Sequence, residues 1–129
     1  MRPHIEMASL DHGKGWSPLS GFDGVEVKLL ASDLDEARRC GARSRLVRFA
    51  PGVSTQGTLT HGYWEEVYIL SGDMFSLCRP DAPSLAPMYS IRPPGTPHGP
   101  FGSRRGCVLL EVQYFVQVES DSNLINCFP

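Results

Sequence analysis

The sequence has no apolar run that approaches the roughly 20 residues needed to span a bilayer. Its N-terminal stretch, MRPHIEMASLDHGKG, also lacks the continuous apolar segment of a secretory signal peptide. We therefore expect a cytoplasmic protein that has no membrane partner.

Long stretches of basic charge are missing as well. The chain has 12 Lys and Arg residues against 14 Asp and Glu residues, which gives a formal net charge of −2. Its densest basic pairs, Arg38-Arg39 and Arg104-Arg105, are too short to follow a phosphate backbone. This pattern argues against a nucleic-acid partner.

No CxxC pair occurs among the cysteines, which are Cys40, Cys78, Cys107 and Cys127. The absence of such a pair argues against a zinc ribbon and against a thioredoxin-like redox site. In a cytoplasmic chain, isolated cysteines are typically reduced and buried. We expect most of these cysteines to be in that state.

The sequence does contain a series of short apolar segments, separated by many of its 13 glycines and 11 prolines. The predicted strands are 24–32, 43–52, 65–73, 73–80, 87–95 and 106–118, with Gly72-Asp73 as the turn of a hairpin. Only residues 32–41 have a helical pattern, and they fit a loop equally well. Many short strands in a chain of 129 residues predict one all-β domain, a sandwich or a barrel.

The stretch HGYWEEVYILSG, residues 61–72, places a histidine ahead of two glutamates and an apolar strand. If the chain reverses between His61 and Glu65, both side chains can point into one cavity. Neighbouring residues of a strand face opposite sides, so only one of Glu65 and Glu66 points inward. Both faces are apolar beyond the glutamates, and the alternation alone does not decide between them.

A second histidine, His98, follows the Pro- and Gly-rich stretch RPPGTP. Proline fixes φ, so this loop is stiff and holds the imidazole in one direction. Two histidines and one carboxylate form the donor set of a 2-His-1-carboxylate metal site, which leaves coordination positions open for water, dioxygen or substrate. The set suits divalent iron, zinc, nickel or manganese and does not choose among them. Each histidine taken alone would fit an ordinary structural role.

These stretches resemble the cupin family, and most closely its ChrR-like subgroup. The first cupin motif ends in a glutamate followed by a glycine, a spacing that Glu65 and Gly72 fit. The second motif reads P-G-x-x-H, and PGTPH matches it at residues 94–98. The ChrR-like features occur in order: Trp16, GVEVKLL, LVRFAPG, EEVYILSG, and PPGTPHGPF followed by Gly-Cys.

The resemblance covers about residues 16–117 and implies a cupin double-stranded β-helix, that is, a jelly-roll barrel. It divides the chain into an N-terminal arm (1–15), a cupin domain (16–118) and a C-terminal tail (119–129). It also selects Glu65 over Glu66 and thereby assigns the metal ligands, which are His61, Glu65 and His98.

One departure from the family pattern concerns the first motif histidine, whose position is taken by Leu59. The site would then hold a metal with three side chains and water, or Gln56 or Tyr63 would supply a further ligand, or the pocket would bind a molecule without metal. A missing ligand opens a coordination position, which is typical of catalytic sites.

Other side chains are candidates for the pocket. Tyr68 is one of several aromatic and Met residues that could line it, although core packing is their commoner role. Glu111 and Gln113 share one face of the last strand and could handle substrate or protons if that face points inward. The opposite face is more apolar and has the better claim to the core. Arg92 is expected at the surface, with a salt bridge or an anionic substrate as alternatives.

The resemblance to small cupin dioxygenases implies a metal-dependent oxidoreductase acting on a small-molecule ligand such as a diketone. An isomerase or a hydrolytic enzyme would use the same ligands without redox chemistry. ChrR-like zinc-bearing domains imply a second class, a non-catalytic cupin that binds, senses or stores a metal or ligand. Small cupins commonly associate through sheet edges, so we also expect a homodimer.

Overall fold

The structure, a computed structural model, describes residues 1–82 and 84–117. Within these residues the regular elements are all strands, which confirms the predicted all-β class. They are β1 (Ser17–Pro18), β2 (Val25–Ser32), β3 (Ala42–Phe49), β4 (Trp64–Ser76), β5 (Ser84–Leu85), β6 (Met88–Arg92), β7 (Phe101–Gly102) and β8 (Cys107–Tyr114). The described part of the chain has no helix that could cross a membrane.

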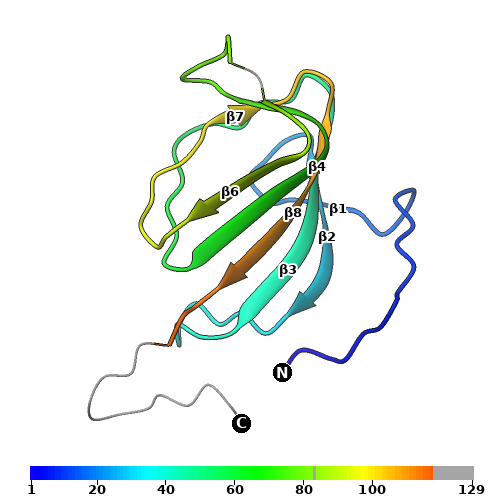
Figure 1. The fold of residues 1–129 in the computed structure, drawn as a ribbon, viewed down its shortest axis with the longest axis vertical. Helices are drawn as coiled ribbons and strands as arrows, with labels where there is room; N and C mark the ends of the chain where they lie inside the picture. Colours follow the sequence, from blue (N-terminus) through cyan, green and yellow to red (C-terminus); the bar gives the residue numbers. More distant parts are fainter. Residues whose placement is uncertain (83, 118–129) are drawn as a thin grey trace.

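Strands β2, β3, β8, β4 and β6 lie side by side in one antiparallel sheet, with β1 beyond β2 (Figure 1). The long strand β4 changes partners along its length. Its first half pairs with β8 and β6, and its last residues pair with β5 and β7. Opposite the sheet, the segment before β4 meets the loop after β6, because Leu59 and His98 exchange two backbone hydrogen bonds.

The predicted hairpin at Gly72-Asp73 is wrong, because Trp64–Ser76 is one continuous strand. Gly72 lies close to a register shift in the ladder between β4 and β8 and has a φ of +82°. A positive φ favours glycine, and it occurs at bulges as well as in turns. The Asp73 carboxylate accepts backbone hydrogen bonds from the loop before β8. The Gly72-Asp73 pair in the sequence therefore marks a bend within a strand.

The two faces of β4 differ sharply in burial. Glu65, Val67 and Ile69 are buried, whereas Glu66 and Tyr68 point away from the interior. The inward glutamate is therefore Glu65, as the family pattern indicated. On the outer face, the Glu66 carboxylate accepts hydrogen bonds from two tyrosine hydroxyls of the neighbouring strands.

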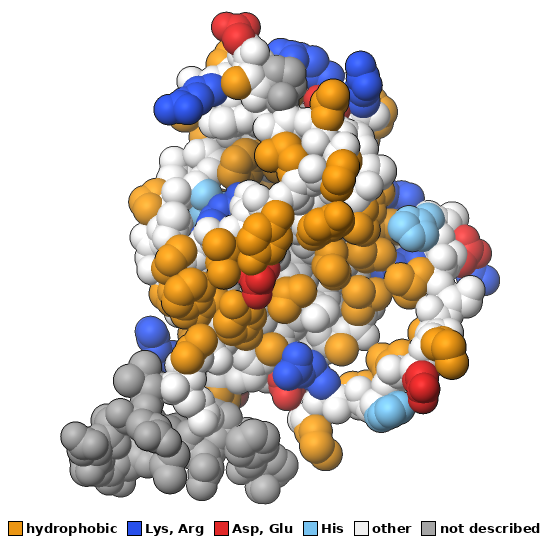
Figure 2. All heavy atoms as spheres, viewed as in Figure 1, with side chains coloured by type: hydrophobic (Ala, Val, Ile, Leu, Met, Phe, Trp, Pro, Cys, Tyr) orange, Lys and Arg blue, Asp and Glu red, His pale blue; other side chains and the backbone are white. Residues whose placement is uncertain are grey.

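The inward face of β8 is the one that carries Cys107, Leu109, Glu111 and Gln113. The expectation that the more apolar face has the better claim to the core is wrong. That face instead forms part of an outer surface on which hydrophobic side chains gather (Figure 2). The core consists of Val25, Val47, Phe49, Val67, Ile69, Met74, Cys107 and Leu109.

The remaining segments are irregular. After β2 the chain from 33 to 41 forms turns, so the loop alternative holds for the segment with a helical pattern. Residues 1–15 are exposed and contain no strand. Cys40 and Cys107 are buried, and Cys78 is exposed. The predicted tail 119–129, with its cysteine, lies outside the described residues.

Candidate metal centre

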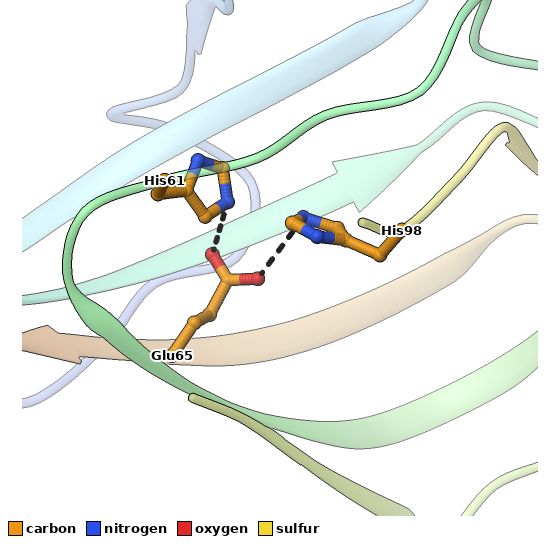
Figure 3. A group of neighbouring side chains, drawn as sticks. All are labelled: His61, Glu65 and His98. Carbon is orange, nitrogen blue, oxygen red and sulfur yellow. Dashed lines mark ion pairs between the residues drawn. The ribbon is translucent and has the colours of Figure 1, made fainter. Parts of the chain in front are cut away.

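Three side chains from two distant segments meet inside the barrel. His61 lies in the loop before β4, Glu65 is the second residue of β4, and His98 lies in the loop between β6 and β7. One ligand atom from each lies within 4.8 Å of the others (Figure 3). The structure therefore brings together the three residues that the sequence pointed to.

The Glu65 carboxylate lies between the two imidazoles. His61 Nε2 is 3.5 Å from Glu65 Oε2, and His98 Nε2 is 3.6 Å from Glu65 Oε1. His61 Nε2 is buried and has no hydrogen-bond partner among the described residues. A buried polar atom without a hydrogen-bond partner is destabilising, so this nitrogen is available as a donor to a metal ion.

The orientation of His98 is fixed by the stiff loop that precedes it. His98 Nδ1 lies 3.0 Å from the Thr96 carbonyl oxygen. Because a carbonyl only accepts hydrogen bonds, Nδ1 carries the proton and the neutral ring presents a lone pair on Nε2. Burial lowers the pKa of His98, which favours this neutral form. A neutral imidazole with its other nitrogen held by a carbonyl is the usual arrangement of a metal-binding histidine.

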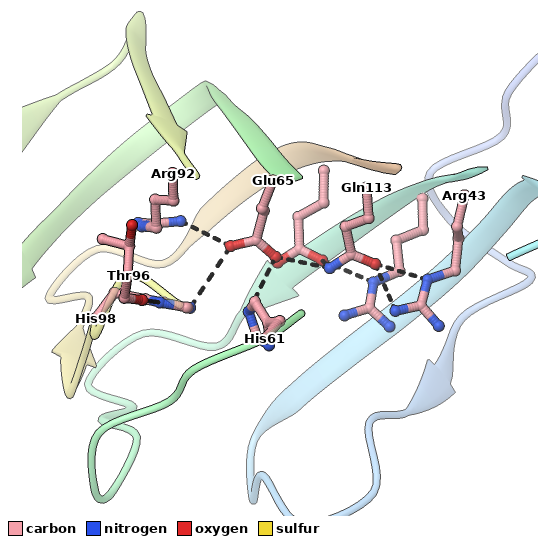
Figure 4. Close-up of polar contacts among 9 residues, drawn as sticks. Arg43, His61, Glu65, Arg92, Thr96, His98 and Gln113 are labelled. Carbon is pink, nitrogen blue, oxygen red and sulfur yellow. Dashed lines mark hydrogen bonds and ion pairs between the residues drawn. The ribbon is translucent and has the colours of Figure 1, made fainter. Parts of the chain in front are cut away.

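The register of the sheet surrounds Glu65 with polar partners. Arg43 on β3, Gln113 on β8, Glu65 on β4 and Arg92 on β6 are direct cross-strand neighbours, in that order. Arg92 Nη1 donates to Glu65 Oε1 at 2.8 Å, and Gln113 Nε2 donates to Glu65 Oε2 at 2.7 Å (Figure 4).

These contacts keep Glu65 ionised. Burial by itself raises the pKa of the Glu65 carboxyl, but the contact with His61, the hydrogen bond from Gln113 and the charge of Arg92 outweigh it and lower the pKa to about 2. The candidate ligand is therefore a carboxylate throughout the physiological range.

A second polar pair lies two residues away from Arg43 and Gln113, on the same inward faces of β3 and β8. Arg45 Nε donates to Glu111 Oε2 at 2.7 Å, and the two residues are cross-strand partners on β3 and β8. Burial raises the pKa of Glu111, and the neighbouring Arg45 acts against that shift. Both side chains face the same cavity as Glu65.

The cavity has a volume of about 240 Å³ and is mostly apolar apart from this polar wall. It is lined by Leu19, Phe22, Val25, Arg45, Val47, Phe49, Thr55, Leu59, His61, Tyr63, Glu65, Val67, Met74, Arg92, His98, Phe101, Leu109 and Glu111. The Tyr63 ring stacks on His61 with 4.7 Å between ring centroids. Burial raises the pKa of Tyr63 to about 12, so its hydroxyl stays protonated.

Three of the five pocket candidates line this cavity and two do not. Leu59, Tyr63 and Glu111 belong to the lining. Gln56 is exposed in the loop before β4, and Tyr68 faces outward from β4 with 43% of its surface exposed. Their side chains lie outside the cavity, so the structure does not support either as a pocket residue.

Three arginines have a larger part in the site than the sequence indicated. The side chain of Arg92 is only 15% exposed and is paired with Glu65, so the assignment of Arg92 to the surface is wrong. Arg43 and Arg45 were not singled out at all. The signal was present in RSRLVRF, where both arginines share the strand face of Val47 and Phe49, which are core residues. Two charged residues on the strand face that points to the core indicate a buried polar network.

The donor set fits a divalent metal ion. His61 offers an unpartnered nitrogen, His98 offers a lone pair, and Glu65 offers the negative charge. Two imidazoles and a carboxylate suit iron(II), zinc, nickel or manganese. Leu59, which stands where the cupin pattern has its first histidine, lines the cavity and has no donor atom in its side chain.

The fold is the jelly-roll barrel of cupins of known structure. No family model matches the sequence, and no curated protein matches it. Solved structures do match. An RmlC-like cupin from Shewanella frigidimarina NCIMB 400 is 14% identical with a TM-score of 0.62, over 88% of this chain and 94% of that one.

Two further structures bear on function. An acetylacetone dioxygenase from Acinetobacter johnsonii is 16% identical with a TM-score of 0.64, over 96% of this chain and 85% of that one. A chain in the Rhodobacter sphaeroides complex of SigE with the anti-sigma ChrR is 20% identical with a TM-score of 0.55, over 75% of this chain and 46% of that one. At these identities the likeness establishes the fold.

Proposed function

We propose that the chain is a metal-dependent oxidoreductase of the dioxygenase type that acts on a small organic molecule. The observation that supports this proposal is the convergence of His61, Glu65 and His98 on a largely apolar cavity, with one imidazole nitrogen left without a partner. The likeness to an acetylacetone dioxygenase supports the same class of reaction. An iron(II) ion held there would polarise substrate oxygen atoms and exchange electrons with dioxygen.

The residues of the chain prepare the site before a substrate enters. His61 and His98 supply nitrogen donors, and Glu65 supplies the charge. Gln113 and Arg92 hold the Glu65 carboxylate from two sides, so its orientation is fixed in advance. The apolar walls lower the local dielectric constant, which strengthens the electrostatic contacts inside.

Metal binding is tested with His98→Ala. We expect the wild-type protein, purified without a histidine tag, to hold about one metal ion per chain, and the variant to hold less than about a tenth of that, because one of three donors is lost. Elemental analysis by mass spectrometry measures the content, and circular dichroism checks that the fold is kept. His4→Ala removes an exposed histidine and should change nothing. Full metal content in His98→Ala would show that the ligand assignment is wrong.

The reaction class is tested on the same preparations. We expect oxygen uptake that depends on acetylacetone, another diketone or a catechol-like ketone, and we expect it to be absent in His98→Ala. An oxygen electrode measures the rate. Metal binding without oxygen uptake for any of these compounds would overturn the proposed dioxygenase activity. An isomerase or a ligand-sensing cupin would then remain as the proposed function.

We also propose that the protein is a cytoplasmic homodimer that pairs through β6. Among the described residues β6 pairs only with β4, so one edge of this strand is open. An open edge is normally covered in a native protein. Its outward residues Tyr89 and Ile91 are 54% and 48% exposed, and their cross-strand partners on β4 are Tyr68 and Glu66.

A further inference from the structure

The polar network around the candidate metal centre contains more positive than negative charge. Its arginines and carboxyl groups are Arg43, Arg45, Arg92, Glu65 and Glu111. Three guanidinium groups therefore face two carboxyl groups. Each carboxylate has its own arginine, and the third arginine is bound to an uncharged amide.

The excess charge is not compensated inside the network. Arg43 donates through Nε to Gln113 Oε1 at 2.7 Å, and among the described residues its side chain has no carboxylate partner. A divalent ion at His61, Glu65 and His98 would raise the excess by two further charges. Arg43 does not line the cavity, whose arginines and carboxyl groups are Arg45, Arg92, Glu65 and Glu111. Its charge therefore acts on the cavity as a positive potential from behind Gln113, and such a potential favours an anionic ligand.

Arg92 is the residue placed to receive such an anion. It lines the cavity, and its side chain makes one hydrogen bond among the described residues, from Nη1 to Glu65. The guanidinium lies over the Phe101 ring, 5.4 Å from its centroid. Arginine has five N–H donors in a planar fork that suits a carboxylate, so the donors on Nε and Nη2 remain for a ligand.

The rest of the cavity determines the size and polarity of the ligand. Beyond the polar wall the lining is apolar, with Val67, Met74 and Leu109 among the residues that form it. The volume of about 240 Å³ admits a small molecule rather than a peptide or a polymer. His61 and Arg92 keep 19% and 15% of their side-chain surface exposed, so solvent reaches the polar end.

We propose that the cavity selects a small organic anion, with its carboxylate or enolate oxygens on Arg92 and an apolar body against the barrel core. This inference names the substrate class of the proposed enzyme and rests on that proposal for its reaction. The preference for an anion rests on the chain's own charges, so it is expected in the metal-free protein too.

The test compares a matched pair of probes, 4-methylpentanoate and its neutral isostere 4-methylpentanamide. Isothermal titration of metal-free protein is expected to show the acid binding about tenfold more tightly than the amide. Arg92→Gln should weaken acid binding roughly tenfold and leave amide binding within about twofold, since the variant loses the charge but can still donate to Glu65. Arg79→Gln, at an exposed arginine, should match the wild type.

Two further measurements make the outcome decisive. Arg92→Lys keeps the charge and should keep most of the preference for the acid. Raising the ionic strength from about 0.02 M to about 0.3 M should weaken acid binding and leave amide binding unchanged. Equal affinities for acid and amide, an unchanged preference in Arg92→Gln, or no binding of either probe would overturn the inference. Metal content is measured separately, so a failed metal site and a failed anion site are distinguishable.

Discussion

Gln113 links the candidate metal centre to the rest of the polar network. The residue is 1% exposed, and both ends of its amide are engaged, because Arg43 donates to Oε1 while Nε2 donates to Glu65. A guanidinium only donates hydrogen bonds, so Arg43 fixes the amide with its nitrogen toward the carboxylate. The neutral Gln113 side chain thus orients the Glu65 carboxylate, the charged candidate ligand of the metal.

We expect Gln113→Leu to lower the free energy of unfolding by about 2–4 kcal/mol, because Arg43 and Glu65 lose their shared partner in a buried setting. Metal affinity should fall roughly 10–100-fold, since Glu65 is no longer oriented. Urea denaturation and a competitive metal titration measure the two effects. Gln56→Leu, at an exposed position, should stay within about 0.5 kcal/mol of the wild type. Equal losses in the two variants would contradict the role assigned to Gln113.

Strand β4 organises the barrel because it changes partners at a bend. Up to Ile69 it carries Glu65 between β6 and β8, and from Asp73 onward it pairs with β5 and β7. Gly72 lies between these two parts. A Cβ atom at this residue would lie 1.9 Å from the Gly106 carbonyl oxygen, so the backbone of the loop before β8 comes too close for any side chain.

We expect Gly72→Ala to lower the free energy of unfolding by about 3–5 kcal/mol, because it combines an unfavourable φ with a backbone clash. Gly52→Ala is the matched control, since Gly52 has a φ of +81° and nothing within 4 Å of its Cβ position. Strain in φ alone should cost the control about 1 kcal/mol. Urea denaturation gives both values. Similar losses at the two glycines would show that the clash contributes nothing.

At the scale of the elements, alternation predicted strand positions well and the choice of face poorly. The strands over 24–32, 87–95 and 106–118 appear within a few residues as β2, β6 and β8. The sequence left the inward face of β8 open, because Glu111 and Gln113 also look like surface residues. They face inward because Arg45 and Arg43 lie opposite them on β3. Arg45 and Glu111 are separated by 66 positions in the sequence, and Arg43 and Gln113 by 70.

At the scale of the whole molecule, the apolar outer face of β4 and β6 bears on assembly. Tyr68, Leu70, Tyr89 and Ile91 are all more than two-fifths exposed. Contiguous exposed apolar surface is uncommon on a soluble monomer and typically marks an interface. An isologous contact across the open edge of β6 would cover these residues in both copies.

We expect light scattering after size exclusion to give the mass of two 14.2 kDa chains. Ile91→Lys should shift the protein to the monomer mass, because it places a charge on the proposed interface. Leu29→Lys, on β2 with 61% exposure, should leave the dimer intact. A wild-type monomer, or a dimer unaffected by Ile91→Lys, would remove the proposed assembly.

The sequence by itself determined the all-β class, most strand positions and, through the family pattern, the three candidate ligands. Local features carry this information: alternation, the proline-stiffened loop before His98 and the spacing of His61 and Glu65. Only the tertiary structure decided that Arg43, Gln113, Glu65 and Arg92 form one row across four strands. Burial of a charge depends on partners from distant strands, and the sequence does not place those partners.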